Sequence, residues 1–125
     1  MPGRILIVED DAFLVMLLRD LLYERGYEVI GVAADAKGAL QQAAAGNPDL
    51  VLADIHLHGH VDGIQAAIEI KKRHSTEVVF LTSADDFATV ERAKIARPAA
   101  YLNKRTDLLR VVDAVEHALT AKHAA

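Results

Sequence analysis

The sequence predicts a doubly wound α/β domain, in which a parallel β-sheet carries helices on both faces. Short, continuous apolar runs, mostly rich in β-forming residues, are typical of strands buried on both faces. These runs alternate with segments whose apolar residues recur at helical spacing, and such alternation implies parallel strands joined by right-handed crossovers. The predicted strands cover residues 5–8, 29–32, 50–53, 78–81 and 99–102.

The predicted helices lie between and after these strands. The first and the last have the clearest apolar stripes, and the second is supported by its alanine content over residues 36–45. The stripes are formed by Leu14, Leu17, Leu18, Leu21 and Leu22 in the first helix, Ile64, Ala67 and Ile68 in the third, Phe87, Val90 and Ala93 in the fourth, and Leu108, Leu109, Val112, Val115 and Leu119 in the fifth.

Residues that cap helices stand at the expected boundaries. An Asp or Thr side chain can accept hydrogen bonds from the free N–H groups of a first helical turn, and glycine favours helix ends. The predicted N-caps are Asp11, Asp35, Asp62, Asp85 and Thr106, and the predicted ends are Gly26 and Gly46.

The composition suits one folded domain with a single core, since 52% of the 125 residues are hydrophobic and 26% are charged. We expect one domain over residues 1–125, with a core at roughly residues 4–121 and no output domain. A net charge of −4 argues against direct binding to nucleic acid or to an anionic membrane. The lack of cysteine, of a signal peptide and of an apolar span of about 20 residues favours a soluble, cytoplasmic protein.

Polar residues follow four of the predicted strands at the point where each strand ends. Because ligands of such sheets bind at the carboxyl ends of the strands, the fold should gather these side chains at one edge. Carboxylates brought together and partly buried repel one another unless a cation or a proton compensates. The residues concerned are Glu9, Asp10 and Asp11 after the first strand, Asp54 after the third, Thr82 and Ser83 after the fourth, and Lys104 after the fifth.

This residue set indicates phosphoryl chemistry with Mg²⁺, which prefers oxygen ligands and uses one or two carboxylates. With Asp54 as the nucleophile, the oxygens of an attacked phosphoryl group need neutralising partners. The metal ion, Lys104 and the Thr82 hydroxyl are the available ones. Asp11 is interpreted mainly as a helix cap.

Over essentially its whole length the chain resembles response-regulator receiver domains. The motifs are Ile5-Leu6-Ile7-Val8-Glu9-Asp10-Asp11, Asp54 at the end of the third strand, Asp62-Gly63 at the start of the third helix, Phe80-Leu81-Thr82-Ser83, and Tyr101-Leu102-Asn103-Lys104. Their order and spacing both agree with the family. The resemblance implies a flavodoxin-like (βα)5 sandwich with parallel strands in the order 2-1-3-4-5.

The resemblance also implies a role for each matching residue. Asp54 would be the phosphoacceptor, and Glu9 and Asp10 would hold Mg²⁺ with Asp54, directly or through water. The backbone carbonyl of His56 would complete the metal site. Thr82 would hydrogen-bond the phosphoryl group, Lys104 would form an ion pair with it, and Tyr101 would be the aromatic switch.

Partners follow from the same resemblance. A sensor histidine kinase or a histidine phosphotransfer protein would donate the phosphoryl group. The fourth helix, fifth strand and fifth helix would form the surface that contacts a downstream effector, and a homodimer through that surface is a family expectation. The domain would catalyse its own phosphorylation and dephosphorylation but would not be a turnover enzyme.

Two features depart from the family pattern. Arg105 follows the lysine where the family usually has proline, often joined by a cis peptide. A non-proline cis bond costs roughly 2.5 to 4 kcal/mol, so the loop is either trans or strained. The loop after Asp54 is one residue longer than the commonest form and lacks its usual proline.

That loop places histidines at alternate positions, His56, His58 and His60. Imidazole is a common ligand for zinc, copper and nickel. Because no fourth ligand is evident, we interpret these histidines as solvated and any binding of Ni²⁺ or Zn²⁺ as adventitious.

Three other functions fit parts of the pattern. A pseudo-receiver would fold alike and signal without phosphorylation, but it would be expected to lose Asp54, Lys104 or the acidic pair. A Mg²⁺-dependent phosphatase of the haloacid-dehalogenase type needs a second Asp where this chain has His56. A flavin-binding protein needs a phosphate loop after the first strand, where three acidic residues stand instead.

Two residue assignments stay open. Either Thr82 or Ser83 supplies the switch hydroxyl, and Tyr101 is either the aromatic switch or an aromatic residue that fills the core.

Overall fold

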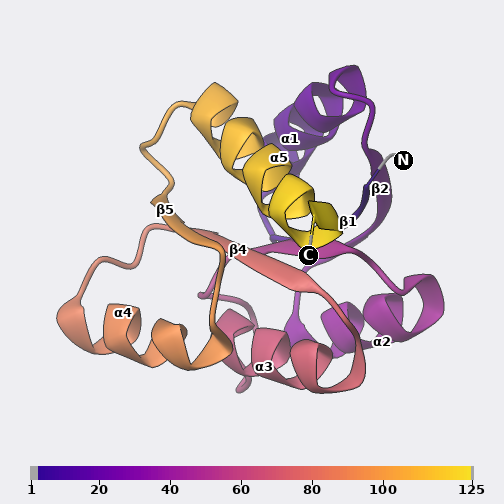
Figure 1. Ribbon diagram of the computed structural model, residues 1–125. Helices are drawn as coiled ribbons and strands as arrows, with labels where there is room; N and C mark the ends of the chain where they lie inside the picture. Colours follow the sequence, from indigo (N-terminus) through magenta and orange to yellow (C-terminus); the bar gives the residue numbers. More distant parts are fainter. Residues whose placement is uncertain (1–2, 125) are drawn as a thin grey trace.

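The computed structural model describes residues 3–124 and contains the predicted alternation of strands and helices (Figure 1). All strand pairs are parallel, and the sheet has the order β2-β1-β3-β4-β5. The fold class and the strand order are therefore confirmed. The elements are β1 (Arg4–Val8), α1 (Ala12–Glu24), β2 (Glu28–Ala33), α2 (Ala36–Gly46), β3 (Leu50–Ala53), α3 (Gly63–Arg73), β4 (Glu77–Thr82), α4 (Phe87–Ala93), the 3₁₀ turn η1 (Lys94–Ala96), β5 (Ala100–Asn103) and α5 (Leu108–Ala124).

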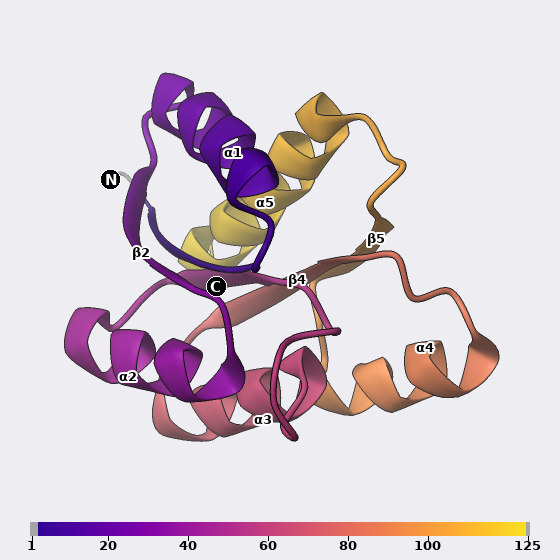
Figure 2. The same ribbon diagram turned by 180° about the vertical axis from the view of Figure 1, so that it is seen from behind.

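Helices cover both faces of the sheet: α1 and α5 lie on one face, and α2, α3 and α4 lie on the other (Figures 1 and 2). Because successive side chains of a strand point to opposite faces, β1 contributes to both halves of the core. Ile5 and Ile7 pack with α1 and α5, whereas Leu6 and Val8 pack with α2 and α3. The continuous apolar runs of the sequence thus correspond to strands buried on both faces.

Three of the predicted N-caps are confirmed and two are wrong by one residue. The side chains of Asp11, Asp35 and Asp62 accept backbone hydrogen bonds at the starts of α1, α2 and α3. Asp86, not Asp85, caps α4, because its carboxylate accepts from both the N–H and the hydroxyl of Thr89. At the start of α5, Asp107 replaces Thr106 and accepts from the N–H of Leu109 at 2.9 Å.

The predicted helix ends lie where expected, but only one has a left-handed glycine. Gly26 follows α1 with φ +87°, a conformation that glycine adopts without a steric penalty. After α2 the left-handed residue is Asn47, with φ 47°, and Gly46 is the last helical residue.

Gly63 matters for the position of the functional site. A Cβ atom added there would lie 1.9 Å from the carbonyl oxygen of Asp54, so the start of α3 packs directly against the backbone that leaves β3. The Gly63 N–H also donates to the Ile55 carbonyl at 2.8 Å. This close approach holds both ends of the intervening loop near Asp54.

In the part of the chain that the structure describes, no helix has the length and apolar character needed to cross a membrane.

Candidate functional site

The site lies at the carboxyl ends of β1, β3, β4 and β5, where the backbone ladders continue for one residue beyond the strands. Asp54 N–H donates to the Val8 carbonyl at 2.9 Å, and Lys104 N–H donates to the Thr82 carbonyl at 3.0 Å. Because the carboxyl ends of the parallel strands share one edge of the sheet, residues up to 95 positions apart come together, from Glu9 after β1 to Lys104 after β5. Of the predicted strand-end residues, Glu9, Asp10, Asp54 and Lys104 meet at one edge. The Asp11 side chain instead caps α1, and Ser83 is exposed.

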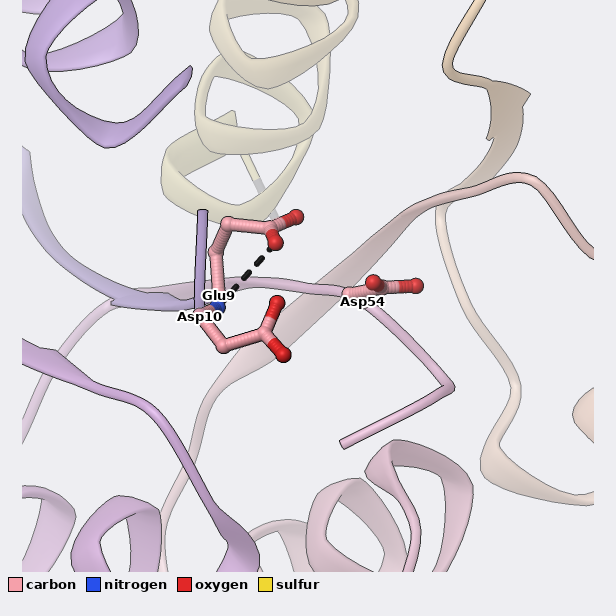
Figure 3. A group of neighbouring side chains, drawn as sticks. All are labelled: Glu9, Asp10 and Asp54. Carbon is pink, nitrogen blue, oxygen red and sulfur yellow. Dashed lines mark hydrogen bonds between the residues drawn. The ribbon is translucent and has the colours of Figure 1, made fainter. Parts of the chain in front are cut away.

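Three carboxylates form the centre of the site (Figure 3). Oxygen atoms of Glu9, Asp10 and Asp54 lie within 4.8 Å of one another. Glu9 and Asp54 are buried, with exposed fractions of 4% and 5%, whereas Asp10 is exposed. Such an all-oxygen donor set, open to solvent through Asp10, fits a hard divalent cation that keeps several waters.

Lys104 compensates part of this negative charge. Its Nζ lies 2.9 Å from Glu9 Oε1 and 2.9 Å from Asp54 Oδ2. Burial raises the pKa of Glu9, although Lys104 and the backbone N–H of Asp11 act against that rise. Partial burial alone would lower the pKa of Lys104, but its hydrogen bonds to both carboxylates outweigh burial and raise that pKa. One ammonium among three carboxylates leaves negative charge that a cation could compensate.

Each buried carboxylate has further fixed partners. Glu9 Oε2 accepts from the backbone N–H groups of Asp10 and Asp11, both at 3.0 Å. Asp54 Oδ1 accepts from the N–H of His56 at 3.4 Å. Within the described residues, Asp54 Oδ2 has a hydrogen-bond partner in Lys104 alone. Glu9 and Asp54 are therefore held in one orientation before any ligand arrives.

Thr82 and Tyr101 are connected through Ala84. Thr82 is fully buried at the end of β4, and its Oγ1 accepts from the Ala84 N–H at 3.2 Å. The Tyr101 hydroxyl donates to the Ala84 carbonyl at 2.5 Å, and its ring lies edge-on to Phe80 with centroids 6.1 Å apart. Ser83 is exposed and Asp86 caps α4, so the hydroxyl that is joined to Tyr101 in this way is that of Thr82.

The loop between β3 and α3 makes two contacts that sequence analysis did not find. His58 Nε2 lies 3.1 Å from Asp10 Oδ2, and Asp62 pairs with Arg92 of α4. Partial burial would raise the pKa of Asp62, but the Arg92 hydrogen bond and the Gln65 N–H hold it below its ordinary value. No sequence signal predicts either pair, because each joins residues more than 25 positions apart through a loop.

In residues 3–124, the carboxylates of Glu9, Asp10 and Asp54 are the one group of three or more potential metal ligands that lie together. The alternating histidines do not gather into a second such group.

Arg105 takes the place of the usual proline without a cis bond, since the described residues contain no cis peptide. Asn103 Oδ1 accepts from the backbone N–H of Arg105 at 2.8 Å and from its Nε at 3.3 Å. The loop after β5 is thus trans and is held by the Asn103 side chain.

Comparison with known proteins identifies the family. The family model of the response regulator receiver domain matches residues 5–116. The chain belongs to this family. Over 119 residues this receiver domain is 39% identical to the transcriptional regulatory protein PdtaR of Mycobacterium tuberculosis, a match that covers 95% of the chain and 58% of PdtaR. It is 34% identical to the chemotaxis protein CheY of Thermotoga maritima over 92% of the chain and 96% of CheY. The chain therefore spans little more than half of the first of these relatives and nearly all of the second.

Solved structures agree with this assignment. The signal receiver domain of a modulated diguanylate cyclase from Desulfovibrio desulfuricans superposes with a TM-score of 0.91 at 32% identity, covering 99% of this chain and 98% of that one. The receiver domain of an HD domain-containing protein from Pseudomonas fluorescens gives a TM-score of 0.91 at 28% identity, over the full length of both chains. The chain is therefore a receiver domain of the response-regulator type, which is consistent with two-component signalling.

Proposed function

We propose that this receiver domain accepts a phosphoryl group on Asp54 from a phosphohistidine donor, in a reaction that depends on Mg²⁺. The observation that carries the proposal is the environment of the Asp54 carboxylate. It is buried, it lies within 4.8 Å of two further carboxylates, and it contacts a lysine ammonium at 2.9 Å. A carboxylate in these surroundings can act as a nucleophile, because neighbouring carboxylates can bind a cation and a lysine ammonium supplies a fixed positive charge.

In the proposed reaction an Asp54 oxygen forms a bond to phosphorus while the bond between phosphorus and the donor imidazole nitrogen breaks. The electron pair of the broken bond leaves with the donor histidine. Glu9, Asp10, Asp54 and the backbone carbonyl of His56 would hold Mg²⁺, which when bound supplies positive charge to the phosphoryl oxygens. Lys104 moves from the Asp54 oxygen to a phosphoryl oxygen, and its charge stays within the site.

The Thr82 hydroxyl would then report the presence of the phosphoryl group. In the structure it accepts a hydrogen bond from Ala84, whose carbonyl holds the Tyr101 hydroxyl. If Thr82 turns to donate to a phosphoryl oxygen, the segment at Ala84 loses its hydroxyl acceptor and moves with it. Tyr101 follows this segment, which transmits the change to the surface of α4, β5 and α5.

That surface is suited to partner binding. Phe87 of α4 and Leu109 of α5 are large apolar residues with exposed fractions of 79% and 53%. We propose that a downstream effector protein binds there, and that a second copy of the chain is the alternative occupant. The phosphoryl donor is a sensor histidine kinase or a histidine phosphotransfer protein. Residues 1–125 act as one domain that controls its own phosphorylation and is not a turnover enzyme.

The proposal is tested by intact-mass analysis after incubation with acetyl phosphate, with and without Mg²⁺. We expect one phosphoryl adduct on the native protein in Mg²⁺ and none on Asp54→Asn. Asp20→Asn, on the exposed face of α1, is the matched control and should still gain the adduct. A native protein that binds Mg²⁺ but gains no adduct from acetyl phosphate or from a phosphohistidine donor would overturn the proposal in favour of a pseudo-receiver. Continuous release of phosphate from a phosphomonoester would instead indicate a phosphatase.

A further inference from the structure

The imidazole side chains of the loop histidines have no role in the proposed function, yet one of them contacts the candidate metal site. His58 Nε2 lies 3.1 Å from Asp10 Oδ2, within hydrogen-bond distance. The backbone of His58 also forms an isolated parallel bridge with Asp35, the N-cap of α2. The loop after β3 therefore crosses toward the β2 side of the sheet, where its histidine reaches the exposed carboxylate of the site.

The three carboxylates of the site differ in how they are held. Glu9 is fixed by Lys104 and by two backbone N–H groups, and Asp54 is fixed by Lys104 and by the N–H of His56. Within the part of the chain that the structure describes, the Asp10 carboxylate contacts neither Lys104 nor a backbone N–H group. Among the described residues, His58 is the one side chain outside the carboxylate triad that pairs with the Asp10 carboxylate. Asp10 is thus the carboxylate of the three that is open to solvent, with a side chain 33% exposed.

The contact with His58 is compatible with a bound cation. It uses Oδ2 of Asp10, and with the contact in place the carboxylates of Glu9, Asp10 and Asp54 still lie within 4.8 Å of one another. A carboxylate can give one oxygen to a metal and the other to a hydrogen-bond donor, and such outer contacts orient ligands in many metal sites. The three carboxylates therefore stay together while the imidazole contacts Asp10.

We propose that His58 is a positioning residue for the divalent metal ion, acting through the contact of its imidazole with the Asp10 carboxylate. This inference rests on the proposed function only in taking Asp10 as a ligand of that metal. Removing an outer-shell partner typically lowers metal affinity 10- to 100-fold. Because the His58 side chain is 81% exposed, we expect the low end of this range, a loss of about tenfold.

The test measures the affinity of the untagged protein for Mg²⁺ and Mn²⁺ by isothermal titration calorimetry. His58→Ala should lower the affinity for each ion about tenfold. His58→Gln, whose amide nitrogen can donate to the same oxygen, should recover most of the native affinity. His60→Ala, in the same exposed loop, is the matched control and should bind both ions as the native protein does.

Two further measurements separate the outcomes. Thermal unfolding without metal should be unchanged in His58→Ala, which excludes a general loss of structure. Phosphorylation by acetyl phosphate should equal that of the native protein at saturating Mg²⁺ and fall below it at limiting Mg²⁺. An unchanged or tighter affinity in His58→Ala would overturn the inference, the latter showing that His58 competes with the cation. A native protein that binds Mg²⁺ but is never phosphorylated would refute the proposed function alone, because the affinity comparison does not need the reaction.

Discussion

Replacing Lys104 with alanine should destabilise the metal-free protein, because two buried carboxylates would lose their counter-ion. The ammonium lies 2.9 Å from Glu9 Oε1 and 2.9 Å from Asp54 Oδ2, and the two acidic side chains are 4% and 6% exposed. Removing one partner of a buried ion pair costs about 3 to 5 kcal/mol. Since the Lys104 side chain is itself 27% exposed, water can reach the space it leaves, and we expect a loss of about 2 to 3 kcal/mol.

Mg²⁺ should reverse part of this loss. The variant site carries one more uncompensated negative charge, so it should bind the cation more tightly than the native site does. A ligand that binds only the folded state raises the free energy of unfolding in proportion to the logarithm of its concentration over its dissociation constant. We therefore expect Mg²⁺ to stabilise Lys104→Ala more than it stabilises the native protein.

Urea unfolding followed by far-ultraviolet circular dichroism, with and without saturating Mg²⁺, measures both effects. The matched control is Lys94→Ala, whose ammonium lies 2.7 Å from Glu91 Oε1 but whose side chain is 66% exposed. Exposed pairs of this kind contribute about 0 to 1 kcal/mol. If Lys104→Ala lost no more stability than Lys94→Ala in the absence of metal, the reasoning from burial and pairing would be refuted.

Three other substitutions test separate features. Arg97 has a left-handed backbone with φ 49°, so Arg97→Gly should raise the unfolding free energy by about 0.5 to 1 kcal/mol in urea titrations, whereas Arg97→Ala should not. Thr82→Ala removes the acceptor of the Ala84 N–H and should cost about 1 to 2 kcal/mol, a loss that Thr82→Ser should avoid. Burial raises the pKa of Glu9 from its ordinary value of 4.5, which means that ionised Glu9 opposes folding. In the absence of metal, Glu9→Gln should therefore unfold with a higher free energy than the native protein at neutral pH. Unfolding curves at decreasing pH should show this difference in stability vanish below pH 4.5, and a difference that stays constant with pH would contradict the reasoning.

The fold was predictable because its signals are local and repeated. Each strand is visible in the sequence as a short apolar run. Asp11, Asp35 and Asp62 cap helices through contacts that span two or three residues. The two wrong caps come from neighbouring polar residues that compete for one position. Asp86 has Thr89 three residues later as a double donor, and nothing within the sequence pattern ranks it above Asp85.

The site was predictable only as far as the fold orders the strand ends. The parallel sheet dictates that Glu9, Asp54 and Lys104 meet, and their contacts at 2.9 Å follow from that topology. The contact of His58 with Asp10 depends instead on the path of an irregular loop. No periodicity describes such a path, so the histidines could be noticed in the sequence but not placed.

The most direct test of the central claim is to locate the phosphoryl group chemically. Borohydride reduces an acyl phosphate to an alcohol, so phosphorylated aspartate becomes homoserine, which peptide sequencing by mass spectrometry identifies. After treatment with acetyl phosphate and Mg²⁺, we predict homoserine at position 54 and at no other position. Homoserine at Asp10 instead, or no reduced residue in a protein that binds Mg²⁺, would contradict the assignment of Asp54 as the phosphoacceptor.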